Sequence, residues 1–233
     1  DQMMEEMYAT TTASKSACPS PDDYMKSFEG ADNIVVVTIT GTLSGSYNSA
    51  EIAKKIYIEE HPDTKIHVID SLSAGGEVDL IVRKLNHLVA EGLDFDQVLD
   101  AITAYQAKTK LLFVLAKVDN LVKNGRLSKL VGTVVGLLNI RMVGEASKTG
   151  TLELLQKARG QKKAIKAAFD ELIKAGYTGG HITIAHRNND KFIEQFSALI
   201  REKFAQASIE VLPTSGLCSF YAEEGGLLMG YEI

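Results

Sequence analysis

The feature that most restricts the fold of this chain is a strand pattern that runs directly into a helix pattern, within residues 33–58. Six consecutive β-branched residues, 34–39, predict a strand that is buried on both faces. A turn of small residues follows, and a strand that leads into a helix in this way is typical of α/β folds. After the turn, apolar side chains recur with the period of a helix, at Tyr47, Ala50, Ala53, Ile56 and Tyr57.

The turn between this strand and helix, residues 40–46, reads Thr-Gly-Thr-Leu-Ser-Gly-Ser and predicts a site for a small anionic group. Free backbone N–H groups and the helix dipole favour negative charge at a helix N-terminus, and ligands of open α/β sheets bind at the carboxyl ends of strands. An ordinary turn without a ligand explains the spacing equally well. The chain contains neither GxxxxGK(S/T) nor GxGxxG, so nucleotide binding has no specific support.

The composition is typical of a globular chain and shows no excess of positive charge that would indicate binding to nucleic acid. The 233 residues allow one large domain or two modest ones, and 45% of them are hydrophobic, which is enough for a core. The net charge of -5, with acids and bases interspersed, predicts no nucleic-acid partner and at most transient membrane contact. No apolar run approaches the roughly 20 residues of a membrane span, and no signal peptide is visible. The two distant cysteines, Cys18 and Cys218, favour a reducing cytoplasm.

Strand and helix patterns alternate through the first half of the chain and predict a parallel sheet that is covered on both sides. Ser20 is a good N-cap for a helix that begins at Pro21. Residues 65–70 form a second short strand pattern, and Asp94 with Gln97 forms a capping box for another helix. We place a domain boundary just before a buried strand at 111–115, which gives an α/β domain at residues 1–108.

The second half, residues 109–233, mixes strands and helices in another order and predicts an α+β domain. From residue 181 on, it reads as strand, helix, strand and strand, with Tyr221 in a loop before the final strand. The other predicted elements are a helix that ends at 124–126, a helix around 130–138, strands at 140–143 and 152–155, a helix at 160–175, a strand at 181–186, a helix at 190–204, and strands at 209–212 and 226–231.

Ser44 is a candidate nucleophile, which keeps an enzyme hypothesis open. The hydrolase elbow needs Gly-x-Ser-x-Gly, whereas this turn reads Gly-Thr-Leu-Ser-Gly at 41–45, one residue out of register. His181 or His186 would have to supply the base. These two histidines are an odd number of residues apart on a predicted strand, so they face opposite ways and predict no metal site. The hydroxyls are more simply explained as donors to a ligand or as helix caps.

Two arginines, Arg126 and Arg159, lie in polar breaks that contain glycine, NGRLSK and ARGQKK. Arginines in such breaks bind carboxylates or a partner protein in many proteins, and solvated arginines near helix ends fit the pattern at least as well. Tyr221 has two interpretations of the same kind, because its phenol either donates to a ligand or covers the core.

Four short motifs occur in order along nearly the whole chain. They are KSACPS at 15–20, TLSGSYNSA at 42–50, VIDS at 68–71 with the glycines after it, and NGRLS at 124–128 followed by ARGQKKA at 158–164. Together they resemble the DegV family of fatty-acid-binding proteins. The second motif is the most specific, since it is similar to that family's Leu-Ser-Gly-Thr-Tyr-x-x-Ala turn and helix.

The resemblance implies a two-domain α/β protein that buries one fatty acid between its domains. The acyl chain would lie in an apolar tunnel, largely in the second domain, and the first domain would hold the carboxylate. By position, Ser16 and Ser44 would donate to the carboxylate, and Gly45 and Ser46 would supply N–H groups. Such proteins present the fatty acid to a separate kinase that makes acyl phosphate for phospholipid synthesis. Arg159 would dock the kinase or present the head group.

Three departures from the family pattern bear on this expectation. The family's first strand, which ends in Thr-Asp-Ser, is missing, and without it one edge of the sheet would be unpaired. Ser16-Ala17 stands where the family has Thr-Ser, which keeps one hydroxyl and loses another. Residues 221–225 stand where the family has His-Thr-Gly-Pro-Gly. Tyr221 can donate to a carboxylate, but it cannot supply the positive charge of a protonated histidine.

We therefore expect a cytoplasmic fatty-acid carrier with no catalytic residue, no metal and no cofactor. Burial of the methylenes, at roughly 0.8 kcal/mol each, would supply most of the affinity. The hydroxyl and N–H contacts would orient the carboxylate and offset the loss of its hydration. Two rival hypotheses are a hydrolase or phosphotransferase that uses Ser44, and an interaction module with an empty apolar cavity.

Overall fold

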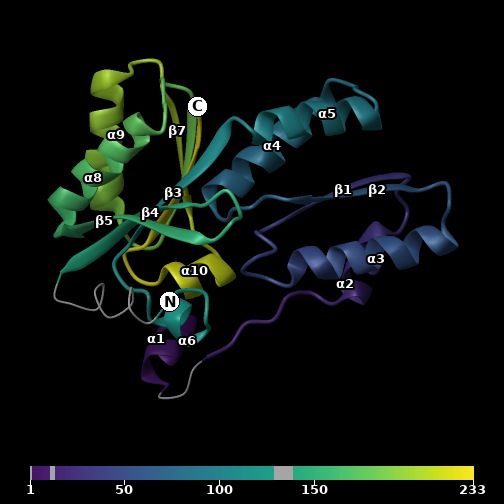
Figure 1. Ribbon diagram of the computed structural model, residues 1–233, viewed down its shortest axis with the longest axis horizontal. Coiled ribbons are helices and arrows are strands. Elements are labelled where there is room, and N and C mark those ends of the chain that lie inside the picture. Colours follow the sequence, from purple (N-terminus) through teal and green to yellow (C-terminus); the bar gives the residue numbers. More distant parts are fainter. Residues whose placement is uncertain (1, 11–13, 129–138) are drawn as a thin grey trace.

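The structure, a computed structural model, describes residues 2–10, 14–128 and 139–233. It contains two sheets that lie beside each other, the smaller one at the right of Figure 1 and the larger one at the left. The strands of the smaller sheet precede residue 108 and those of the larger sheet follow it. The mixed α/β architecture that the sequence predicts is confirmed. The division into domains at 1–108 and 109–233 stays a prediction.

The smaller sheet consists of two parallel strands, with a pair of helices on each side (Figure 1). Alternate residues of the first strand face opposite layers. Val35 and Val37 pack in the cluster formed with α4 and α5, whereas Ile34 and Val36 pack in the cluster formed with α2 and α3. The elements are β1 (Asn33–Thr38), β2 (Lys65–Asp70), α2 (Pro21–Phe28), α3 (Ser46–Glu60), α4 (Gly76–Ala90) and α5 (Phe95–Gln106).

The prediction that the strand at 34–39 is buried on both faces is wrong, because the strand is less buried than expected. Most of its residues are only half-buried, because β1 pairs with β2 and with no other strand in the described part of the chain. The predicted helix starts are confirmed. Ser20 and Asp94 each accept a hydrogen bond from the backbone three residues on and complete a capping box.

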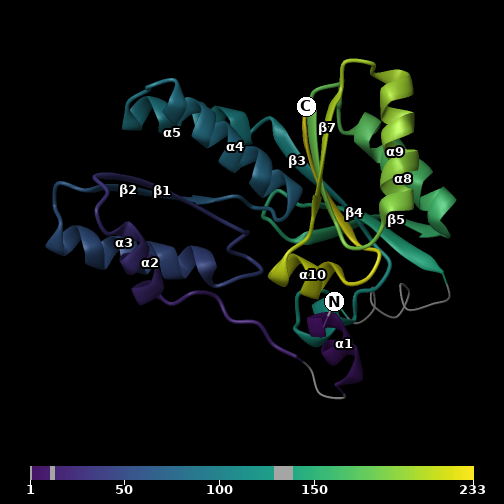
Figure 2. The same cartoon turned by 180° about the vertical axis from the view of Figure 1, so that it is seen from behind.

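The larger sheet contains six strands: β3 (Thr109–Leu115), β4 (Ile140–Ala146), β5 (Leu152–Arg159), β6 (His181–His186), β7 (Ser208–Pro213) and β8 (Leu227–Glu232). Their order across the sheet is β5-β4-β3-β8-β6-β7, and every neighbouring pair is antiparallel except β6 with β7. Two helices, α8 (Gln161–Lys174) and α9 (Asp190–Lys203), cover one face, as Figure 2 shows from behind. The largest apolar cluster fills this layer.

The opposite face of the larger sheet carries a second apolar cluster, which includes Phe113 and Leu115. Two short helices, α6 (Asp119–Lys123) and α10 (Gly216–Ala222), pack there. The N-terminus of α4 also reaches this face. A Cβ atom on Gly76 would overlap the backbone of β8 at Gly230, and one on Gly230 would overlap the backbone of α4. The absence of both side chains therefore lets α4 join the two sheets at close range.

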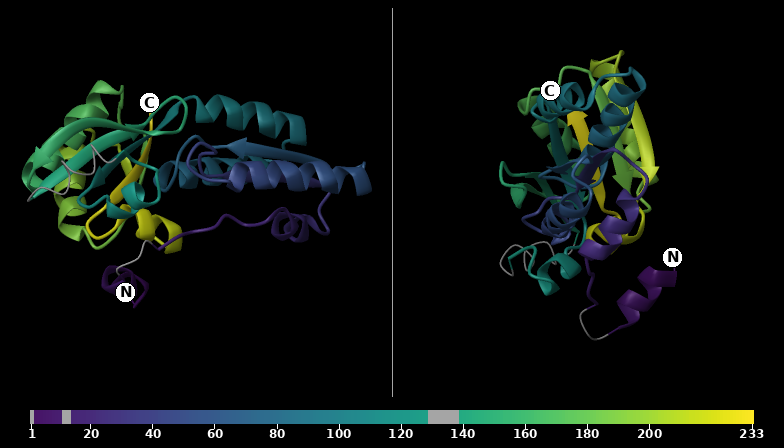
Figure 3. Two further views of the ribbon diagram at one scale, coloured as in Figure 1. Left: turned by 60° about the horizontal axis from the view of Figure 1, so that its bottom comes forward. Right: turned by 90° about the vertical axis from the view of Figure 1, so that its right-hand side faces the viewer.

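The N-terminal helix α1 (Gln2–Ala9) lies away from both sheets (Figure 3). The Nδ2 atom of Asn120 on α6 donates to the sulfur of Met7, and the Tyr8 hydroxyl accepts from the backbone of Glu224 at 3.2 Å. None of the helices in the described residues is long and apolar enough to cross a membrane.

The helices and strands of the structure differ at few places from those predicted from the sequence. The predicted loop that holds Tyr221 is wrong, because this residue lies on α10. Ile56, predicted on the inner side of α3, is exposed, since the buried stripe of that helix runs through Ala50, Ala53 and Tyr57. The predicted helix around 130–138 lies outside the described residues.

Candidate functional site

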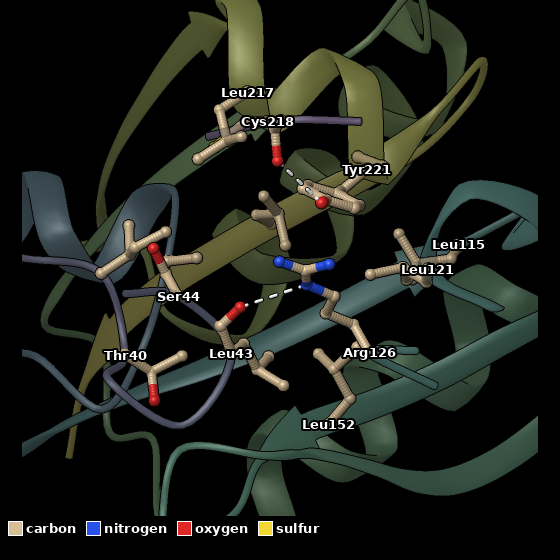
Figure 4. Close-up of a pocket in the computed structure, with 15 residues that line it drawn as sticks. Thr40, Leu43, Ser44, Leu115, Leu121, Arg126, Leu152, Leu217, Cys218 and Tyr221 are labelled. Atoms are coloured by element: carbon tan, nitrogen blue, oxygen red, sulfur yellow. Dashed lines mark hydrogen bonds between the residues drawn. The ribbon is translucent and has the colours of Figure 1, made fainter. Parts of the chain in front are cut away.

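An apolar cavity lies between the two sheets, and Figure 4 shows the side chains that line it. Its empty volume is about 710 Å³, with the open space at the mouth included. The turn at residues 40–46, predicted to bind an anion, forms part of the mouth through Thr40, Leu43 and Ser44. The other apolar lining residues are Ile39 and Ala74 from the first half of the chain, and Leu115, Leu121, Leu152, Leu217, Ala222 and Leu228 from the second.

The turn at 40–46 is held by backbone and carboxylate contacts from the end of β2. The Asp70 carboxylate accepts from the backbone N–H of Gly41, at 3.1 Å to each oxygen, and from that of Leu72 at 2.9 Å. The N–H of Thr40 donates to the carbonyl of Ser73 at 2.8 Å. The Thr40 carbonyl in turn accepts from the N–H of Ser44 at 3.2 Å. These bonds fix where the Ser44 hydroxyl lies.

Two pairs of hydroxyl groups stand at the mouth. Ser44 Oγ lies 3.0 Å from Ser46 Oγ, and the Ser46 N–H donates to Ser44 Oγ at 3.2 Å. Across the cavity lies Tyr221 (Figure 4), and its hydroxyl is 2.9 Å from Ser16 Oγ. Gly45 is the N-cap of α3 and offers no side-chain cap, and the first turn of that helix carries no acid. Its N-terminus therefore favours an anion.

Arg126 places its guanidinium at the mouth between the two halves of the chain (Figure 4). Its Nε donates to the Leu43 carbonyl at 3.2 Å and its Nη1 to the Asn124 carbonyl at 2.7 Å. The guanidinium carbon also lies 5.6 Å from the centre of the Tyr221 ring, within the range of a cation–π contact. Arg126 thus brings a fixed positive charge beside Ser44, Ser16 and Tyr221.

The charges at the mouth suit a carboxylate that carries an apolar tail. No aspartate or glutamate is among the described lining residues, and the cation there is Arg126. Burial raises the pKa of the Cys218 thiol, so this lining residue stays neutral. Hydroxyl donors, a guanidinium and a helix N-terminus together compensate for the lost hydration of an anion. The apolar walls behind them accept hydrocarbon.

The predicted site residues fall into two groups. Ser16, Ser44 and Tyr221 line the same cavity, and Gly45 and Ser46 line an adjoining hollow that shares Ser16 and Ser44 with it.

Arg159 lies elsewhere. It is exposed at the far end of β5, seven residues beyond the cavity residue Leu152, which corresponds to about 23 Å along a strand.

The cavity gives a nucleophilic Ser44 no visible base. No histidine is among the described lining residues. His181 lies on β6 with its Nδ1 atom 2.9 Å from Ser208 Oγ, and His186 Nδ1 accepts from the backbone of Asn189 at 3.1 Å. No group of three or more metal-ligating side chains occurs among the described residues.

The sequence patterns leave the role of Arg126 open, and they do not identify Leu217 and Ala222 of α10 as lining residues. The NGRLSK break marks Arg126 as a polar residue at a helix end, and that description fits a solvated arginine equally. The partner that fixes its role, Leu43, lies 83 positions away in the chain. The signal that could have found it is the motif NGRLS at 124–128, which is part of the family resemblance.

The chain is similar to known proteins of one family. Residues 1–231 match the family model DegV, which is described as an uncharacterised protein of the DegV family. A DegV domain-containing protein of Streptococcus pneumoniae is 77% identical over 233 residues, which are 100% of this chain and 83% of that protein.

Two similar crystal structures contain fatty acids. The fatty acid kinase B3 protein of Streptococcus pneumoniae, loaded with linoleic acid, has a TM-score of 0.99 at 77% identity, over 100% of this chain and 83% of that one. A DegV family protein of Eubacterium eligens, loaded with heptadecanoic acid, has a TM-score of 0.96 at 38% identity, over 99% and 84%. From the family match and these identities, the chain belongs to the DegV family.

Proposed function

We propose that this chain binds one long-chain fatty acid, with its carboxylate at the mouth and its acyl chain in the apolar cavity. The observation that carries the proposal is the convergence of Ser44, the Ser16–Tyr221 pair and Arg126 at the entrance of a cavity whose other walls are mainly aliphatic. The linoleic and heptadecanoic acids bound by the two similar proteins have this same chemistry.

The energetics of such a ligand depend mainly on its tail. Each methylene removed from water contributes about 0.8 kcal/mol, so twelve of them contribute about 10 kcal/mol before the costs of association are subtracted. Contacts to the carboxylate add less, because they replace hydrogen bonds to water. They decide instead which end of the lipid lies at the mouth.

The head group would remain near the surface of the protein. Ser16 and Gly45 are exposed, and Ser44, Ser46 and Tyr221 are partly so. A carboxylate held by these residues is placed where a second protein can reach it. We therefore infer that the chain is a carrier that presents the fatty acid to a fatty-acid kinase for conversion to acyl phosphate, with the exposed Arg159 as a docking residue. The fatty acid is its ligand, and no cofactor is needed.

A reducing cytoplasm is the compartment that fits this role. Both cysteines are free in the structure, and Cys218 lines the cavity. Free thiols persist in reducing compartments.

Substitution of Ser44 tests the proposal. Ser44→Ala removes one hydroxyl group that donates to the carboxylate of the ligand, and it leaves the apolar walls intact. We therefore expect the affinity for oleate to fall about tenfold. Binding of radiolabelled oleate to delipidated protein, followed by ultrafiltration, measures the effect. Ser27→Ala is the matched control, since this exposed serine lies on α2 and donates to the Asp23 carbonyl. An oleate affinity that is the same in both variants contradicts the proposed position of the carboxylate.

A further inference from the structure

The turn between β4 and β5, residues 147–151, packs directly on the turn at 40–46. Gly150 is buried and has a φ of 75°, a backbone conformation that favours glycine. A Cβ atom at this position would overlap the Thr40 hydroxyl and would lie 2.9 Å from Thr40 Cβ and 3.1 Å from the Cα of Leu72. Glycine is therefore needed here for the two turns to approach each other.

A hydrogen bond joins the same two turns. The Thr42 hydroxyl donates to the backbone carbonyl of Thr149. The β4–β5 turn is itself closed by internal bonds, since the N–H of Gly150 donates to the Ser147 carbonyl at 2.9 Å and the N–H of Ser147 donates to the Thr151 carbonyl at 2.8 Å. The turn at 40–46 thus contacts a well-defined surface of the larger sheet.

Thr40 connects this contact to the mouth of the cavity. It is 3% exposed, it lines the cavity, and its carbonyl accepts from the N–H groups of Leu43 and Ser44. From the other side, the Asp70 carboxylate holds Gly41. The turn at 40–46 is therefore clamped between the end of β2 and the β4–β5 turn. A displacement of Thr40 moves the Ser44 hydroxyl with it.

We infer that the β4–β5 turn is a positioning element for the carboxylate, and that Gly150 is its central residue. This inference rests on the proposed fatty-acid binding and adds to it a residue that does not line the cavity. The apolar walls come largely from β3, α6, α10 and β8. Loss of the clamp therefore weakens recognition of the charged head group and leaves hydrophobic burial of the tail in place.

The test compares two ligands with the same tail, oleate and oleyl alcohol, on delipidated protein. Gly150→Ala pushes Thr40 away, and we expect it to lower the affinity for oleate about tenfold, as the loss of a charge-assisted hydrogen bond does. The affinity for oleyl alcohol should change less than about twofold. Gly92→Ala is the matched control, because Gly92 has a φ of 79° and a Cβ atom there would have no described atom within 4 Å. Gly92→Ala places a side chain on a backbone of positive φ, as Gly150→Ala does, but it causes no overlap with other atoms.

A second variant covers the case in which Gly150→Ala does not fold. Thr42→Val removes the hydrogen bond to Thr149 from an exposed side chain, and we expect a smaller loss, of about threefold to fivefold, again for oleate alone. An equal loss for both ligands overturns the inference, since it indicates general destabilisation. The inference is also overturned if neither variant changes the ratio of the affinity for oleate to the affinity for oleyl alcohol. Failure of the unsubstituted protein to bind oleate contradicts the proposed function instead.

Discussion

Arg126 serves both the fold and the site, because its guanidinium binds backbone carbonyls on two separate segments. One is Leu43 in the turn at 40–46, and the other is Asn124 at the end of α6. These bonds fix the side chain with its charge beside Ser44 and the Tyr221 ring. A fixed arginine next to the Tyr221 ring supplies positive charge at the mouth.

Glu223 is a buried acid near the site that joins two of its elements. It follows α10 directly, is fully buried, and has a φ of 55° and a ψ of -173°, a region in which glycine predominates. Its carboxylate accepts from the Asn120 N–H on α6 at 2.9 Å. This bond joins α10, which carries Tyr221, to α6, which ends three residues before Arg126. The strained residue therefore ties together two elements of the mouth.

Burial is the main cause that raises the pKa of the Glu223 carboxyl above 4.5. Asp119 raises it further, while the Asn120 N–H, Lys117 and the Tyr8 hydroxyl lower it. The folded protein consequently binds a proton here more readily than the unfolded chain does. Stability from this group is present below pH 4.5 and is lost as the pH rises through the higher pKa of the folded state.

Glu223→Gln tests this linkage. The amide keeps an acceptor for Asn120 and cannot ionise, so we expect a higher melting temperature at about pH 7 and a smaller fall between about pH 5 and pH 8. Some pH dependence will remain, because burial also raises the pKa of Glu77. Thermal melts across this range measure the effect, with Glu194→Gln, an exposed change on α9, as the control. A variant that is less stable than its parent at neutral pH contradicts the account.

At the scale of elements, the sequence predicts those whose signals are local. The strands at 33–38 and 65–70 follow from runs of β-branched and apolar residues, and the starts of α2 and α5 follow from capping boxes. Helix α10 has only seven residues and no side-chain N-cap. It is held by tertiary contacts such as the bond from Asn120 Nδ2 to the Phe220 carbonyl at 2.8 Å. A local pattern cannot show such contacts.

The same distinction applies to the site. Ser44 and its turn are predictable because strand, turn and helix are contiguous. Tyr221 and Ser16 follow from the family resemblance, and the structure joins them by a bond across 205 positions. Arg126 and Gly150 act through Leu43 and Thr40, which lie far from them in the chain. Their contribution depends on how the two sheets pack.

The far end of β5 is the element on which the proposed kinase contact depends. Arg159 is exposed there and about 23 Å along the strand from the cavity wall at Leu152. Arg159→Ala should therefore leave oleate affinity within about twofold and lower the rate of acyl-phosphate formation by a fatty-acid kinase by about fivefold or more, as loss of an interface arginine does. Arg201→Ala, on the last turn of α9, is the control. Weaker oleate binding with an unchanged kinase rate would reverse the assignment.

At the scale of the whole molecule, the cavity forms where the smaller sheet and its helices pack against the larger sheet and its helices. The mouth takes Ser16 and Ser44 from one half of the chain and Arg126 and Tyr221 from the other. Helix α4 holds the sheets together through Gly76, and the β4–β5 turn adds a second contact. The second half supplies Arg126 and most of the apolar walls, whereas the first half supplies the Ser44 turn and the N-terminus of α3. Binding of an amphipathic ligand is thus a property of the packed pair.

The most direct test of this account is mass spectrometry of an organic extract of the purified protein, with the extracted lipid measured against the protein. We expect long-chain fatty acid at close to one molecule for each chain, and after delipidation the protein should take up added oleate to the same ratio. A protein that yields no fatty acid above the buffer blank, and that takes up no oleate afterwards, contradicts the claim that the cavity holds a lipid.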